Sequence, residues 1–69
     1  MINMTFWDQA MRHYNWAMYL YSNRQPGAAF SYIRLARGGF SKVAESDPVK
    51  KRRAEAMVAK CRGFLKKTG

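Results

Sequence analysis

Four adjacent cations, Lys50-Lys51-Arg52-Arg53, follow residues that are typical of the start of a helix. Asp47 is suited to the N-cap and Pro48 to the first helical position. Because a helix N-terminus carries partial positive charge, each cation in the first turn opposes the helix dipole, at a cost of about 0.3 kcal/mol or more. Helix formation alone does not favour this arrangement, so the cluster indicates a polyanionic partner outside the fold.

The charge of the whole chain is concentrated in the same region. Residues 50–69 hold eight of the thirteen Lys and Arg residues and one of the four acidic residues, and carry +7 of the total +9. A cation that replaces a counterion condensed on nucleic acid releases that counterion, which favours binding. The sequence therefore predicts nucleic-acid binding, with DNA favoured over RNA because the strand pattern of common RNA-binding sheets is absent. The predicted phosphate contacts are Lys50, Lys51, Arg52, Arg53, Arg62 and Lys66, with Arg34 and Arg37 as outlying ones.

Aromatic rings and a cation form a second candidate site. Trp16, Tyr19 and Leu20 lie opposite the main apolar stripe of the first helical segment, with Arg12 beside them. Exposed apolar patches of this composition are typical of protein interfaces. We nevertheless expect this side of the helix to pack against the third helix. Two alternatives remain: a partner-protein or homodimer interface, or stacking of Trp16 and Tyr19 on nucleobases.

Groups suited to catalysis or metal binding are sparse. Cys61 is the only cysteine and His13 the only histidine, so these residues provide neither a disulfide within the chain nor a four-ligand zinc site. Asp8 and Asp47 are expected to be capping residues, and Cys61 is expected to pack as a small hydrophobic residue. Gly38-Gly39 lacks the context of a phosphate-binding loop. We therefore predict no enzymatic activity, no metal and no cofactor.

The hydrophobic pattern predicts an all-α fold, a small bundle of three main helices in a single domain spanning residues 1–69. The first helix is expected at about 5–22, where apolar residues recur with helical periodicity. Thr5 and Asp8 have the spacing of a capping box at its start.

The second helix is expected at about 26–37, with Gly38-Gly39 as its C-terminal signal. It is apolar nearly all round, which is typical of a helix buried between neighbours, so we place it at the centre of the fold. Residues 40–46 are expected to form a short connector turn whose Phe40 and Val43 reach the core.

The third helix is expected at about 48–66, with Lys51, Arg52, Arg62 and Lys66 on the face opposite its apolar residues. A helix-turn-helix motif matches only weakly, because the segment between the second and third helices is longer than the turn of that motif. A nuclear localisation signal at 48–53 is a further weak match, since short basic runs occur often by chance.

Two other partners are compatible with the charge. The main alternative to nucleic acid is a protein-interaction module, an inhibitor or adaptor that docks on an acidic surface of its partner. Membrane-surface binding ranks last, because the apolar face of the third helix is better used as core. The sequence contains no run of about 18 apolar residues and no secretory-signal pattern, so we expect a cytoplasmic protein.

Overall fold

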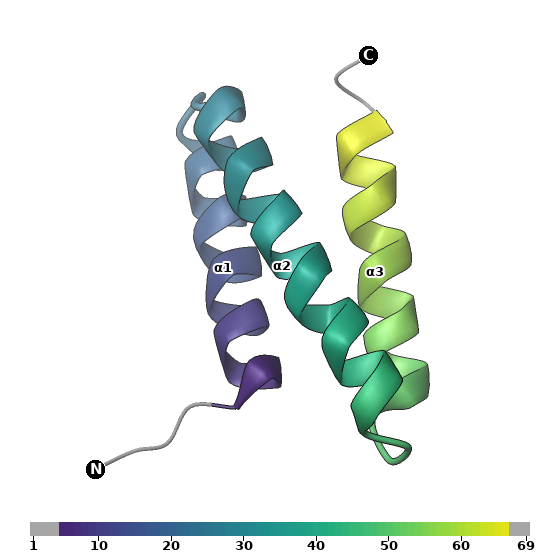
Figure 1. Ribbon diagram of the computed structural model, residues 1–69. Helices are drawn as coiled ribbons and strands as arrows, with labels where there is room; N and C mark the ends of the chain where they lie inside the picture. Colours follow the sequence, from purple (N-terminus) through teal and green to yellow (C-terminus); the bar gives the residue numbers. More distant parts are fainter. Residues whose placement is uncertain (1–4, 67–69) are drawn as a thin grey trace, which may run out of the picture.

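The computed structural model describes residues 5–66, which form three helices in one thin layer. They are α1 (Phe6–Ser22), α2 (Pro26–Ser46) and α3 (Lys51–Lys66). α2 lies between α1 and α3 and packs against both (Figure 1). The Cα atoms extend over 34 × 30 × 13 Å, so each helix is exposed on at least one side. The predicted all-α fold and the central position of the second helix are confirmed.

The predicted capping box begins α1. The amide of Asp8 donates to Thr5 Oγ1 at 3.1 Å, and the amide of Thr5 donates to Asp8 Oδ2 at 3.4 Å. The Asp8 carboxylate also lies at the positive end of the helix, where negative charge is stabilising. These local interactions define the start of the helix.

The other end of α1 closes with a residue in the left-handed region. Arg24 has φ 61°, and the amide of Gln25 donates to the carbonyl of Leu20 at 2.9 Å. This bond satisfies a carbonyl that the helix itself leaves without a partner. Pro26 then begins α2, where its missing N–H costs nothing.

α2 continues through Gly38-Gly39 to Ser46, so the predicted stop after Arg37 is wrong. Neither glycine has a positive φ, and residues 40–46 belong to the same helix rather than to a connector. A helix-turn-helix with its turn at the glycines is therefore ruled out.

Gly39 has a packing role that explains its position inside the helix. A Cβ added to Gly39 would lie 2.9 Å from the Cβ of Ala10 on α1, closer than real side chains pack. A glycine here therefore lets the backbones of α1 and α2 approach each other. Phe40 and Val43, which were expected to reach the core, are both buried.

α3 begins later than the sequence predicts. Asp47 Oδ1 accepts hydrogen bonds from the amides of Val49 at 3.0 Å and Lys50 at 3.3 Å. Asp47 therefore stabilises a turn over residues 48–50, and the helix starts at Lys51 rather than at Pro48. This type of local carboxylate–amide bond favours turns as readily as helix starts.

The core consists largely of small side chains. The buried hydrophobic residues are Ala10, Ala17, Leu20, Ala29, Ile33, Ala36, Phe40, Val43, Ala54 and Cys61. Trp7 packs edge-on against Phe40, with ring centroids 5.2 Å apart, and Tyr21 of α1 packs edge-on against Phe64 of α3 at 5.5 Å. The alanines let the helices pack closely, and the rings cover the space that remains.

Candidate nucleic-acid interface

The first turn of α3 contains Lys51, Arg52 and Arg53, all exposed, and no acidic residue. These cations lie at the end of the helix where the dipole favours negative charge. Lys50 is separated from them, because it is half-buried in the preceding turn and lines a hollow with Thr5 and Trp7. Three of the four predicted cluster residues therefore lie in the unfavourable first turn.

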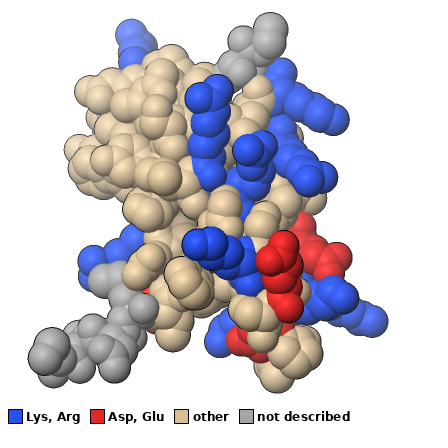
Figure 2. Space-filling view, viewed as in Figure 1, with Lys and Arg blue, Asp and Glu red and all other residues tan. Residues whose placement is uncertain are grey.

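Arg62 and Lys66 extend the cationic surface along α3. Both are exposed, and Arg62 lies about three turns beyond Lys51 on the same side of the helix. Lys51 and Lys66 bound a helix about 22 Å long. The space-filling view shows Lys and Arg side chains gathered along this helix (Figure 2). By the same spacing, Arg53 and Lys60 lie on the opposite side.

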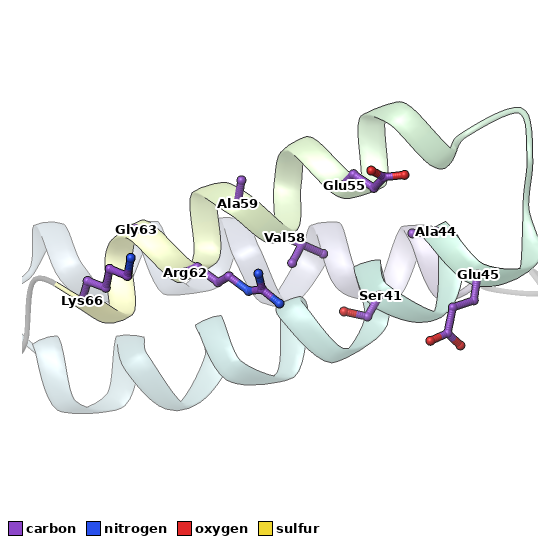
Figure 3. A pocket seen from close by; sticks show the side chains of 9 residues that line it. All are labelled: Ser41, Ala44, Glu45, Glu55, Val58, Ala59, Arg62, Gly63 and Lys66. Atoms are coloured by element: carbon purple, nitrogen blue, oxygen red, sulfur yellow. The ribbon is translucent and has the colours of Figure 1, made fainter.

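A groove of about 600 Å³ separates this side of α3 from α2. Small residues line much of it, among them Ser41, Ala44, Ala59 and Gly63. Arg62 and Lys66 lie toward one end, and Glu45 and Glu55 lie toward the end nearest the α2–α3 turn (Figure 3). A phosphate is therefore attracted to the Arg62 end of the groove and repelled from the other.

Glu55 divides the cationic side of α3 into two parts. It lies one turn after Lys51 on the same side of the helix, between the cations of the first turn and those of the last. On this side of α3, Glu55 therefore separates Lys51 from Arg62 and Lys66.

The aromatic site of α1 is exposed except for one residue. Trp16 is 47% and Tyr19 57% exposed, and their rings stack with centroids 5.1 Å apart and an interplanar angle of 21°. Leu20 is buried in the core and does not belong to this surface. The expectation that this side of α1 packs against the third helix is wrong, because Trp16 and Tyr19 are exposed and the ring that meets Trp16 edge-on at 6.5 Å is Tyr32 of α2.

Two adjoining hollows along α1 and α2 extend this aromatic site. We call this surface the α1–α2 track. Its aromatic residues are Phe6, His13, Trp16, Tyr19 and Tyr32, and its cations are Arg12, Arg34 and Lys42. His13 lines both hollows and lies 5.9 Å from Tyr32, measured between ring centroids. Among the described residues that line the two hollows there is no Asp or Glu.

Sequence reasoning missed Phe6, Tyr32 and Lys42 as members of this surface. Lys42 was placed in a connector, whereas the structure places its Nζ 5.1 Å from the centre of the Phe6 ring. A continuous α2 aligns Arg34, Gly38 and Lys42 at one-turn intervals on its exposed face. That spacing is visible in the sequence once the glycines are not taken as a stop.

The Cys61 side chain of α3 is buried in the core as an apolar group. Burial raises the pKa of its thiol, and the nearby Arg37 partly opposes that rise. Burial also raises the pKa of Tyr14, with a further contribution from Cys61. The thiol is therefore protonated at neutral pH, which suits a packing role.

Within residues 5–66, no group of three or more His, Cys, Asp or Glu side chains comes together as a metal site. In the same part of the chain, no helix is both long and apolar enough to cross a membrane. Comparison with protein-family models, curated proteins and solved structures gives no match.

Proposed function

We propose that this protein binds nucleic acid through phosphate contacts made by the cationic side of α3. The observation that carries the proposal is the first turn of α3, where Lys51, Arg52 and Arg53 are exposed and no acid is present. These cations weaken their own helix through its dipole and through mutual repulsion. An external row of phosphates relieves both effects.

The length of the surface supports a duplex partner. Lys51 and Arg62 lie on one side of a helix about 22 Å long, and duplex DNA carries one phosphate charge per roughly 1.7 Å of its axis. The helix can therefore follow the edge of one groove with contacts at both of its ends. Phosphate contacts of this kind fix affinity and orientation and do not select a base sequence.

An acidic partner protein is the second candidate. Carboxylates satisfy the same cations, and the exposed Trp16, Tyr19 and Arg12 have the composition of interface hot spots. Nucleic acid is favoured because Lys51 and Arg52 are adjacent and lie on the side of α3 that also bears Arg62. A regular phosphate backbone supplies closely spaced charges that a folded protein surface rarely offers.

The test is a mobility-shift titration of labelled duplex DNA over a salt series. We expect the logarithm of the binding constant to fall linearly with that of the salt concentration, with a slope of about −0.9 per phosphate contact. Lys66→Gln should make the slope shallower by about 0.9. Lys60→Gln removes the same charge from the opposite side of α3 and should change the slope less. Equal effects of the two variants, or no binding at about 50 mM salt, would overturn the proposal.

A further inference from the structure

The α1–α2 track differs from α3 because it combines cations with exposed ring faces. Trp16 and Tyr19 are one turn apart on α1 and stack nearly parallel. Tyr32 of α2 packs edge-on against Trp16, with ring centroids 6.5 Å apart. Flat aromatic side chains in a positively charged groove are the usual means by which proteins hold unpaired bases.

We propose that the α1–α2 track binds single-stranded nucleic acid, with unpaired bases stacked on Trp16 and Tyr19. The inference rests on the proposed nucleic-acid binding and adds a second surface and a second form of substrate. A duplex keeps its base faces inside the helix, where these rings cannot reach them. A single strand leaves those faces open.

Cations lie at intervals along the track in positions suited to the sugar-phosphate backbone. Arg12 lines the hollow that contains Trp16, and Arg34 and Lys42 line the neighbouring one. Lys42 lies over the ring of Phe6, so ring and cation are paired at that end too. Because no described acid lines either hollow, a strand that follows the track meets no repulsive charge.

A second copy of this chain is a poorer occupant of the track. A two-fold interface pairs each surface with itself, so the cations of one copy would face those of the other. No described acid in the lining can compensate them, and each chain carries a net charge of +9. Like charges in such an interface oppose association.

The experiment uses Trp16 as its own reporter. Trp7→Phe leaves Trp16 as the only tryptophan, and the substitution keeps an aromatic ring against Phe40. We expect an oligothymidylate to quench Trp16 fluorescence, because a base stacks on the ring. A DNA duplex should quench it much less, and inorganic polyphosphate, which has charges and no bases, should not quench it.

Ring-removing variants measure the contribution of stacking. Trp16→Ala and Tyr19→Ala should each weaken oligothymidylate binding by about tenfold and leave duplex binding unchanged. Tyr21→Ala removes another exposed tyrosine of α1 that does not line the track, and should change neither affinity. Circular dichroism confirms that each variant is helical.

The outcomes separate this inference from the proposed function. Duplex binding without quenching by oligothymidylate would overturn the track and retain α3 as the binding surface. Quenching without any duplex binding would support the track and overturn the role of α3. If Trp16→Ala abolishes a self-associated state and leaves single-strand affinity unchanged, the surface belongs to a second copy and the inference is wrong.

Discussion

α3 and the α1–α2 track carry cations in two chemical settings. The cationic side of α3 has no exposed ring in its groove and shares that groove with Glu45 and Glu55. The track interleaves cations with rings, and its described lining includes no acid. Charge alone suits a phosphate backbone, whereas charge with open ring faces suits a backbone whose bases are also accessible. The two surfaces therefore differ both in their ring content and in the acids that line the α3 groove.

The largest expected effect comes from removing two of the first-turn cations of α3. The double substitution Lys51→Gln and Arg52→Gln should weaken duplex binding by about 20-fold at low salt, because up to two phosphate contacts are lost. The same change should raise the free energy of unfolding by about 1 kcal/mol, since it relieves the conflict with the dipole. Mobility shifts and thermal melts by circular dichroism measure the two effects.

A loss of helical structure in that variant would contradict the proposed binding role of these cations, because it would show that they are needed for folding. A drop in single-strand affinity equal to the drop in duplex affinity would contradict the comparison of the two surfaces. Both substrates would then depend on one surface.

The next largest effect should come from the contact that joins α1 to α2. Gly39→Ala places a methyl group 2.9 Å from the Cβ of Ala10 and should lower the free energy of unfolding by about 1–3 kcal/mol. Gly38→Ala is the matched control, because nothing lies within 4 Å of its added Cβ. That control should stabilise the protein by up to about 1 kcal/mol, the helix-propensity difference between the two residues. Urea denaturation of both variants measures the difference.

The same pair of variants tests the independence of the two surfaces. Gly39 lies between the helices that form the track, whereas α3 packs on another side of α2. Gly39→Ala should therefore reduce quenching of Trp16 by oligothymidylate more than it reduces duplex binding. An opposite order of effects would show that the track does not depend on how α1 and α2 approach each other.

Gly39 also shows which parts of the molecule are predictable from sequence. The capping box of Thr5 and Asp8 was predicted correctly, because its bonds join residues three positions apart. Two adjacent glycines have the same local pattern whether they end a helix or let another helix approach. The identity of the neighbour, Ala10, decides between these roles and is far away in the sequence.

In the candidate site, too, features within one helix were predictable from sequence and features that depend on a neighbouring helix were not. The sequence placed Lys51, Arg52, Arg62 and Lys66 correctly on one side of α3, because spacing within a helix fixes which side residues share. It placed Lys50 on the same helix, whereas Lys50 lies in the turn before it. The track combines α1 with α2, so predicting it requires the register between two helices. Burial of Leu20 likewise depends on α2, because a spacing rule applied to α1 alone places Leu20 with Trp16 on the exposed side.

A smaller effect is expected at Cys61, which is buried in the core. Cys61→Ala should lower the free energy of unfolding by about 1 kcal/mol, as expected for the loss of a small buried group. Neither duplex nor single-strand affinity should change. Loss of binding in a well-folded Cys61→Ala variant would show that the thiol has a chemical use.

The thiol also predicts how stability depends on pH. Burial raises the pKa of Cys61 above its ordinary value of 9.0, so the unfolded chain releases the thiol proton first as pH rises. Because the folded state then binds more protons, the contribution of Cys61 to stability is constant below about pH 8 and falls as pH rises through the raised pKa. Cys61→Ala should remove the early part of this fall, and the part due to Tyr14 should remain at higher pH. Thermal melts of the unchanged protein and of Cys61→Ala between pH 7 and about pH 11 measure this loss of stability.

The smallest expected effect has the opposite sign and concerns the acid that distinguishes the two surfaces. Glu55→Gln removes a negative charge from the groove beside α3 and should strengthen duplex binding about threefold, because a repulsive charge near the phosphates is lost. Single-strand binding should change less, since Glu55 does not line the track. Asp8→Asn is the control. Asp8 lies at the start of α1 and lines neither the α3 groove nor the track, so this variant makes the same charge change away from both surfaces. If Asp8→Asn strengthens duplex binding as much as Glu55→Gln does, net charge alone controls binding and the position of the cations on α3 is irrelevant.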